Sequence, residues 1–253
     1  MKRKIAALAF TSSIFSWPEL RQGIEERKVR ERQLRVISQN GQQRLQDLSR
    51  LLNQGKINKE EYQDRYESLK TEIVQQAQKV TFGGRTKEER EGFLRENGCV
   101  KINQEAIEAI KAIKRKIIEI GAGSGHWAKA LQDVGLDIIA FDSFENVPIK
   151  DQKVFDVKKV QTEEDLKRIL QKHSERALLL VYPPPGPFAL KSVQTHGGKI
   201  LIYCGEGYGG ANADEAFFDY VDKYYKPLST VYKFETFDDN SFERLWVLEK
   251  QGN

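Results

Sequence analysis

The sequence is poor in the residues that build disulfide frameworks and metal sites. Its 253 residues include only two cysteines, Cys99 and Cys204, and only three histidines. Two cysteines cannot form a disulfide framework or a four-ligand zinc site, and no histidine stands near either of them in the sequence. We therefore expect neither a metalloenzyme nor a disulfide-stapled secreted domain, and a reducing, cytoplasmic setting is the natural expectation.

Long apolar runs are missing as well. No stretch approaches the roughly 18 consecutive apolar residues of a membrane-spanning helix, so the sequence predicts none. Residues 1–18 begin with three basic residues and a short apolar run, which resembles a cleaved signal or transit peptide. The run breaks at Thr11, and no clean cleavage site follows before Pro18. An ordinary N-terminal arm is therefore the alternative interpretation.

Positive charge is concentrated in the first part of the chain. Residues 1–100 hold 20 Lys or Arg against 14 Asp or Glu, whereas residues 101–253 hold 21 against 23. Such an asymmetry predicts two units with different tasks. A solvated helix face explains the basic excess, and so does a surface that contacts the phosphates of a nucleic acid.

The first unit is predicted to be helical. The stretch from Leu20 to Lys79 has no proline and many good helix formers, with apolar residues at helical spacing. Asn40-Gly41 is the expected break between a first and a second helix. Gly55 is expected to end the second helix, and Asn58 to cap the third, with Glu61 completing a capping box. We take residues 1–85 as this helical N-terminal region.

One part of this region, at about residues 45–73, resembles a known helical hairpin. Residues 48–69 carry leucines, a Gly-x-Ile turn, two acids, an aromatic residue and a final leucine, and so resemble the SHOCT motif. The resemblance implies a protein partner or self-association through residues 20–80 and no chemistry. A plain coiled-coil hairpin explains the same pattern.

The second unit is predicted to be α/β. Phe82-Gly83-Gly84 and the charged run Thr86–Glu91 are typical of a linker, and apolar strands alternate with amphipathic helices from Asn103 onward. The pattern predicts a Rossmann-like doubly wound sheet over residues 93–253, mostly parallel, with one of the last two strands antiparallel because no helix separates them. Its seven expected strands are 116–120, 137–141, 152–160, 177–182, 199–204, 230–237 and 244–249.

A glycine-rich loop carries the main functional signal. The first strand contains Glu119 and is followed by Gly121, Ala122, Gly123 and Gly125. Here the sequence resembles the first motif of class I S-adenosylmethionine-dependent methyltransferases, an acid followed by three alternating glycines. Glycines allow a sharp turn and a close approach of ligand to backbone. The resemblance implies S-adenosyl-L-methionine as cofactor, with Glu119 organising the loop and the methionine end.

A dinucleotide-binding loop is the alternative, because Gly121 and Gly123 also fit Gly-x-Gly-x-x-Gly. His126 stands at the last position of that pattern, and Glu119 disfavours a nearby anion, so the loop favours the methyltransferase interpretation. Asp142 follows the next strand, 21 residues after Gly121, where an acid hydrogen-bonds ribose hydroxyls in this class of fold. Ser143, beside it, is counted with the cofactor-binding residues. A turn-forming aspartate explains Asp142 as well.

The substrate side of the site is less informative. Amino-group methyltransferases carry a polar residue, two prolines and an aromatic residue after the fourth strand, but here Tyr182 and Pro185 hold the first and fourth positions. This departure puts adenine or glutamine methylation in doubt. Glu206 lies in the next glycine-rich loop. We predict that Tyr182 and Glu206 shape the acceptor pocket, although a strand end and a loop cap explain them equally well.

Residues 93–250 also resemble a group of methyltransferase-like proteins that have no assigned substrate. These proteins share EIGAG-x-G-x-WA, a strand ending in Pro-Pro, and GE-x-x-GG. The resemblance implies a methyltransferase whose methyl acceptor the sequence does not name. Two other functions stay open: a binding or scaffold protein that keeps the fold without turnover, and a nucleic-acid methyltransferase that uses the basic N-terminal helices.

Overall fold

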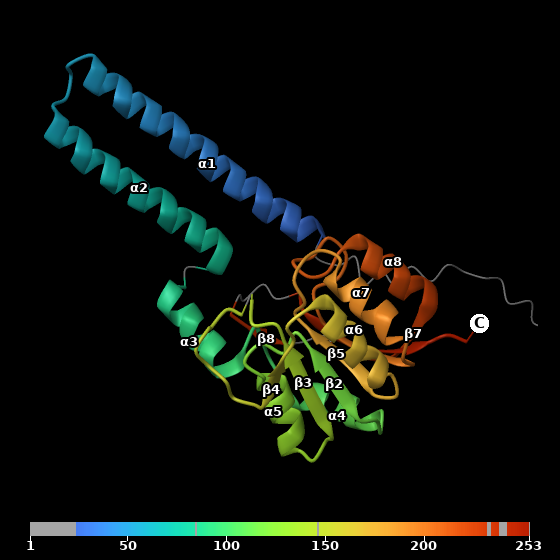
Figure 1. The fold of residues 1–253 in the computed structure, drawn as a ribbon. Helices are drawn as coiled ribbons and strands as arrows, with labels where there is room; N and C mark the ends of the chain where they lie inside the picture. The colour runs from blue at the N-terminus through green and yellow to red at the C-terminus, as the bar shows by residue number, and fades with distance from the viewer. Residues whose placement is uncertain (1–23, 84, 146, 232–233, 238–241, 253) are drawn as a thin grey trace, which may run out of the picture.

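A computed structural model describes residues 24–83, 85–145, 147–231, 234–237 and 242–252. A helical hairpin projects from an α/β domain (Figure 1). The N-terminal stretch that resembles a signal or transit peptide lies outside the described residues. Among the residues described, none of the helices is both long and apolar enough to cross a membrane.

The hairpin consists of two long antiparallel helices, α1 (Ile24–Asn53) and α2 (Lys59–Phe82). The break expected at Asn40-Gly41 is wrong, because α1 runs through both residues. Gly41 is buried, and a Cβ added there would lie 2.7 Å from the Cδ1 atom of Ile73 on α2. The glycine therefore marks a close approach of two helices and not the end of one.

The turn of the hairpin forms as the sequence predicts. Gly55 adopts a φ of +67°, which an L side chain rarely does, and Ile57 is buried beneath the turn. The side chain of Asn58 then accepts the amide of Glu61 at 2.8 Å and caps α2. The second half of the predicted capping box is not confirmed, since the Glu61 carboxylate pairs with Arg65 at 2.6 Å.

The charged run after the hairpin is not the linker that we expected. Thr86 and Glu89 form a complete capping box, and α3 extends from Lys87 to Asn97. A capping box satisfies two amides at a helix start, and this outweighs the polarity of the run. The short strand β1 (Val100–Lys101) and α4 (Gln104–Ala112) follow, and Asn103 caps α4 through the amide of Ala106.

Seven strands form the main sheet, in the order β4-β3-β2-β5-β6-β9-β7. The first five are mutually parallel, and β9 lies antiparallel between β6 and β7. This confirms the Rossmann-like, mostly parallel sheet with one antiparallel strand near its end. The elements of the domain are β2 (Ile117–Ile120), α5 (His126–Asp133), β3 (Ile138–Asp142), β4 (Val157–Lys159), α6 (Glu163–Lys172), β5 (Ala177–Val181), α7 (Phe188–His196), β6 (Ile200–Gly205), α8 (Glu215–Tyr224), β7 (Tyr225–Val231) and β9 (Arg244–Lys250).

The strand expected at residues 230–237 is misplaced. β7 begins at Tyr225, directly where α8 ends, and residues 235–236 form β8 (Glu235–Thr236), which pairs with β1 in a separate two-stranded sheet. Pro227 and an exposed Leu228 hide the strand pattern at the start of β7, because this strand lies at the edge of the sheet.

Two apolar layers cover the two faces of the sheet. On one face, α4 and α5 pack through residues such as Ile110, Trp127 and Leu131. On the other face, α6, α7 and α8 pack over Tyr203 and Trp246. The described residues between β3 and β4 form no helix, and a hollow of about 510 Å³ lies beside α5, lined by residues of α5, β3 and the segment before β4.

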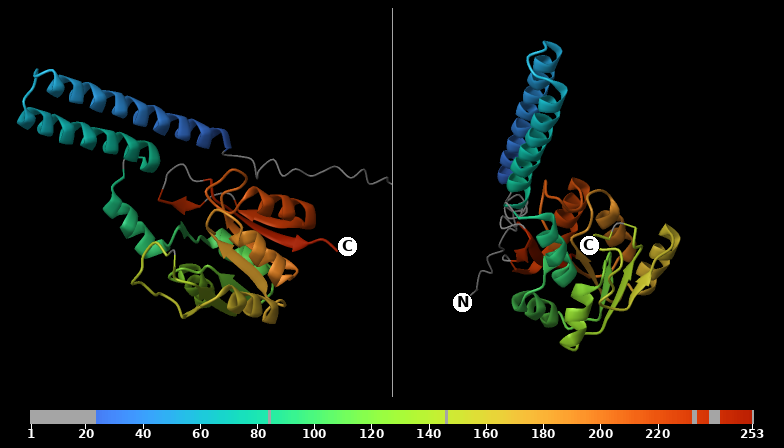
Figure 2. Two further views of the ribbon diagram at one scale, coloured as in Figure 1. Left: turned by 45° about the horizontal axis from the view of Figure 1, so that its top comes forward. Right: turned by 90° about the vertical axis from the view of Figure 1, so that its left-hand side faces the viewer.

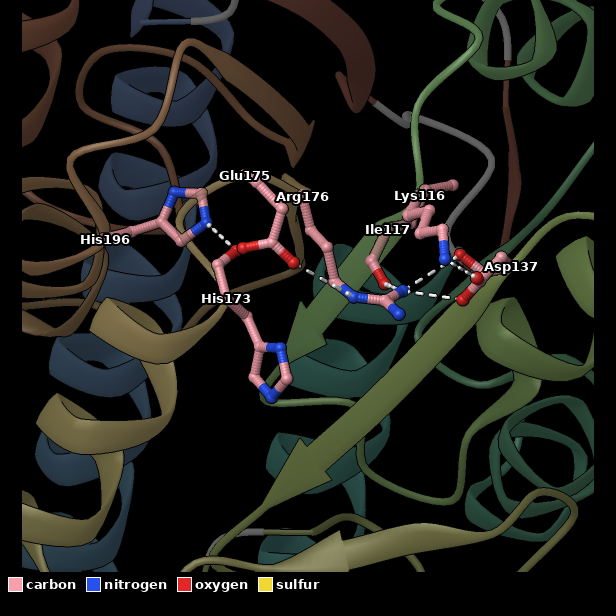
Figure 3. Close-up of polar contacts among 7 residues, drawn as sticks. All are labelled: Lys116, Ile117, Asp137, His173, Glu175, Arg176 and His196. Carbon is pink, nitrogen blue, oxygen red and sulfur yellow. Dashed lines mark hydrogen bonds and ion pairs between the residues drawn. The ribbon is translucent and has the colours of Figure 1, made fainter.

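At the amino-terminal edge of the sheet, charged side chains join three strands (Figure 3). The Arg176 guanidinium donates to the carbonyl of Ile117 at 3.1 Å and to Asp137 Oδ1 at 2.7 Å, and Lys116 pairs with Asp137 at 3.0 Å. The hydrogen bond from Arg176 lowers the pKa of Asp137. This edge is held by paired charges.

Candidate functional site

The carboxyl ends of β2, β3, β5 and β6 meet at the opposite edge of the sheet, where ligands bind in open α/β sheets. The antiparallel β9 begins at this same edge, since Arg244 pairs with Gly205 at the end of β6. The topology thus brings residues from five separate loops and strands together.

The glycine loop between β2 and α5 is tightly constrained. Gly125, with a φ of +87°, lies so close to β4 that an added Cβ would stand 2.6 Å from the Phe155 Cβ. Gly123 has a φ of +55°, and an added Cβ would find no atom within 4 Å. Gly125 is therefore a packing position, whereas Gly123 borders open space.

The amides of this loop are used within the protein. Gly121 and Ala122 donate to the carbonyl of Phe141 at 2.9 and 3.1 Å, and Gly125 donates to that of Ala122 at 2.8 Å. The amide of Gly123 donates to Asp142 Oδ2 at 2.8 Å. A dinucleotide loop offers such amides to a pyrophosphate, so this arrangement favours a ligand without one.

Asp142 thus connects two loops at the end of β3. Its Oδ1 accepts the amide of Phe144 at 2.5 Å while its Oδ2 holds Gly123. Each carboxylate oxygen has a second acceptor position, so contact with a ribose hydroxyl remains a prediction that this geometry allows. Ser143 is exposed, and its hydroxyl accepts the amide of Glu145 at 3.4 Å.

Glu119 lies beneath the start of α5 and is only 2% exposed. The amide of Ala128 hydrogen-bonds to its carboxyl group, which supplies the cap that Gly125 has no side chain to provide. Burial first, and then the charge of Asp142, raise the pKa of Glu119 to about 8. Among the residues that the structure describes, its Oε2 has no hydrogen-bond partner.

Tyr182 follows β5 with strained backbone geometry that the sequence did not reveal. Its φ is +50°, and its amide donates to the carbonyl of Cys204 at 2.7 Å. A bulky residue in this region costs about 1–3 kcal/mol, and such residues cluster at functional sites. The side chain is half-buried at the carboxyl edge.

Glu206 stands at the same edge, after β6. Its Oε2 accepts the amide of Ala211 at 3.0 Å, so its carboxylate orders its own loop. Its carbonyl accepts the hydroxyl of the buried Tyr203 at 2.7 Å. These contacts support the interpretation of Glu206 as a cap of its own loop. The role of Tyr182 and Glu206 in the acceptor pocket remains a prediction.

Asn212 joins the loops that carry Tyr182 and Glu206, and sequence reasoning missed it. The side chain, only 1% exposed, donates to the carbonyl of Pro183 at 3.0 Å and accepts the amide of Glu206 at 2.9 Å. A buried amide that bonds two separate loops fixes their spacing. Its only sequence signal is an asparagine within a glycine-rich loop.

Two buried charged residues at the start of β9 were also missed. Glu243 and Arg244 are 6% and 8% exposed. Glu243 lies near Cys99 and adds to the effect of burial, which raises the pKa of that thiol to about 11. A charged pair directly before the apolar run Leu245–Leu248 was the available signal, since such residues are seldom buried without a role.

The segment before the sheet also reaches this edge. The carbonyl of Arg95, at the end of α3, lies 2.9 Å from His126 Nε2, and the indole of Trp127 donates to the carbonyl of Val100 at 2.8 Å. The start of α5 is therefore held from both sides, by the glycine loop and by residues 95–100.

No protein-family model and no curated protein matches this chain. Among solved structures, the PH0226 protein from Pyrococcus horikoshii OT3 is similar at 12% identity with a TM-score of 0.36, covering 66% of this chain and 100% of that one. Streptococcus pneumoniae Sp1610, described as "a putative tRNA (m1A22) methyltransferase", is similar at 9% identity with a TM-score of 0.30, covering 60% and 72%. At TM-scores of this size neither structure informs the function of this chain.

Proposed function

We propose that this protein is an S-adenosyl-L-methionine-dependent methyltransferase. The observation that carries the proposal is the hydrogen bond from the Gly123 amide to Asp142 Oδ2, at 2.8 Å. It occupies a loop amide that a dinucleotide fold would turn toward a pyrophosphate. A ligand with a positive centre, a ribose and no phosphate fits this loop.

The other acids at the edge support the same ligand. Glu119 is buried under the loop with one carboxyl oxygen lacking a partner within the described residues. While protonated, this carboxyl group can donate a hydrogen bond to the ligand, and a positive centre of the ligand nearby would favour its ionised form, which accepts one from an amino group. The open space over Gly123 leaves room for a cofactor to lie against the backbone of the loop. Glu119, Asp142 and the residues 121–125 are therefore the proposed cofactor contacts, with Ser143 beside them.

S-Adenosyl-L-methionine, when bound, would supply a methyl group on a sulfonium: an acceptor atom would attack the methyl carbon in line, and the neutral thioether would leave with the electrons of the broken carbon–sulfur bond. For such a reaction the protein mainly positions the two partners. Tyr182 and Glu206, held at a fixed spacing by Asn212, border the acceptor side. Neither serves as a nucleophile in this proposal. They bind and orient the acceptor and limit the access of water.

Calorimetry with the full-length protein tests the proposal. We expect S-adenosylmethionine and its demethylated product to bind, and NAD not to bind. Gly123→Ala places a methyl group over the loop and should weaken cofactor binding at least tenfold. Gly135→Ala is the matched control, because Gly135 also has a positive φ and open space around it, away from the site. Binding of NAD without either cofactor form would overturn the proposal.

A further inference from the structure

The two halves of the hairpin differ in charge. We define the proximal half as residues 24–44 and 70–87, next to the α/β domain, and the distal half as residues 45–69. The proximal half holds ten Lys or Arg against four Glu, whereas the distal half holds four against five acids. A solvated hairpin needs no such separation, so the difference requires its own explanation.

Apart from the half-buried Arg30 and Arg85, the described basic side chains of the proximal half are exposed. Three of them form ion pairs that offset their charge: Arg44 with Glu72 at 2.7 Å, Lys70 with Glu67 at 3.8 Å and Lys87 with Glu91 at 3.8 Å. Arg32, Arg35 and Lys79 are exposed and make no ion pair with any residue that the structure describes. The contact of Gly41 with Ile73 sets an antiparallel register in which Arg35 lies at about the level of Lys79.

The proximal half leads to the carboxyl edge of the sheet. Figures 1 and 2 show the N-terminal end of α1 beside the loops near α7 and α8, with the distal half pointing away from the domain. Arg85 fixes the exit of the hairpin by donating to the carbonyl of Phe237 at 2.7 Å. The following helix, α3, ends against His126, next to the glycine loop.

The site itself has the opposite character. Glu119, Asp142, Glu206 and Glu243 gather at the edge, and Glu119 and Glu243 are buried. The carboxylates of Asp142 and Glu206 would repel a phosphate there, whereas an uncharged group could enter. Glu119 adds little charge at neutral pH because its pKa is raised to about 8, and Glu243 is followed in the chain by the buried Arg244. The proximal half of the hairpin thus offers an exposed basic surface, and the carboxyl edge of the sheet offers a site lined with acidic residues. This pattern fits a polymer whose charges lie on its backbone and whose reactive groups are neutral.

We propose that the methyl acceptor is a nucleic acid, with its phosphates on the proximal half of the hairpin and one of its bases at the carboxyl edge. The inference rests on the proposed function for its chemistry, but the binding surface stands on its own. Phosphate contacts give affinity and position, while a base must leave its stack to reach a buried site. Arg32, Arg35 and Lys79 are the assigned phosphate contacts.

Fluorescence anisotropy with the full-length protein tests the surface. The probes are a labelled RNA stem-loop and a DNA duplex of the same sequence, titrated at several salt concentrations. Arg32→Gln with Arg35→Gln removes two contacts, so we expect affinity to fall roughly ten- to fifty-fold near 0.1 M salt and the salt slope to fall by about two. Preference for one probe identifies the polymer.

The distal half supplies the matched control. Lys56→Gln with Lys59→Gln removes the same charge from exposed helix and turn positions and should change affinity less than about twofold. Equal loss in both double variants, or no binding of either probe by a protein that binds S-adenosylmethionine, overturns the inference and leaves the proposed function intact. So does a stable dimer, seen by light scattering, that the proximal variant abolishes while neither probe binds.

Discussion

At the amino-terminal edge of the sheet, Arg176 and Lys116 each form an ion pair with Asp137, and these pairs link neighbouring strands. At the carboxyl edge, Glu119 is buried with a raised pKa, and Tyr182 holds a positive φ. The strands of the sheet thus have stabilising ion pairs at their amino-terminal edge. At their carboxyl edge they have a buried carboxyl group and a strained backbone, which both cost stability. Costly groups persist where the rest of the fold compensates for them, which is the pattern of a functional edge.

Glu119→Gln should give the largest effect. The pKa of Glu119 is about 8 in the folded protein and near its usual 4.5 when unfolded. Between these two pH values the folded state therefore holds a proton that the unfolded state releases. The stability that this protonated group contributes is complete below about pH 4.5 and is lost as the pH rises to about 8. Each pH unit in this window changes the free energy of unfolding by about 1.4 kcal/mol at most.

Urea unfolding at pH 5.5 and 8 measures this effect. We expect wild type to lose roughly 3 kcal/mol more than Glu119→Gln between these values. Glu105→Gln, on the exposed first turn of α4, serves as the control and should follow wild type. Parallel pH profiles for wild type and Glu119→Gln would show that Glu119 is ionised throughout.

Arg176→Ala tests the opposite edge. The substitution removes hydrogen bonds to Asp137 and to the carbonyl of Ile117, so we expect a loss of roughly 2 kcal/mol in the free energy of unfolding. The affinity for S-adenosylmethionine should stay within twofold of wild type, since the contacts lie at the other end of the strands. A loss of affinity in a folded variant would show that the two edges are coupled.

Asp142→Ala removes the carboxylate that holds Gly123 and Phe144. We expect cofactor affinity to fall roughly ten- to a hundred-fold by calorimetry, because hydrogen bonds to a charged group contribute about 1.5–3 kcal/mol. Asp142→Asn keeps the shape of the side chain and should recover part of the affinity. An unchanged dissociation constant for the alanine variant would move the ribose contact to another residue.

The smallest effects are expected on the acceptor side. Tyr182→Phe and Glu206→Gln should each reduce turnover a few-fold, about 1 kcal/mol or less, with cofactor affinity nearly unchanged. Transfer of a tritiated methyl group measures the first quantity and calorimetry the second. Full activity of both variants on an identified acceptor would place the acceptor pocket elsewhere.

Features that depend on nearby residues in the chain could be predicted from the sequence. The glycine loop and Asp142 follow from the spacing of residues around two strand ends, and the turn at Gly55 follows from backbone geometry. What the sequence concealed depends on distant contacts. Gly41 was mistaken for a helix end because its neighbour, Ile73, comes from another helix. Likewise, the role of Asn212 exists only once two loops are side by side.

The order of the strands also bears on how the chain is made. β9 follows β6 and β7 in the chain, yet it lies inside the sheet, between these two strands. On the ribosome, the hairpin emerges complete before the first strand of the sheet, whereas β7 has no partner in the main sheet until β9 has been made. The edge of β6 stays open during that interval and can pair with other chains. A nonsense mutation before Arg244 would make that exposure permanent, so chaperones and proteases, rather than loss of the site, would decide the fate of the product.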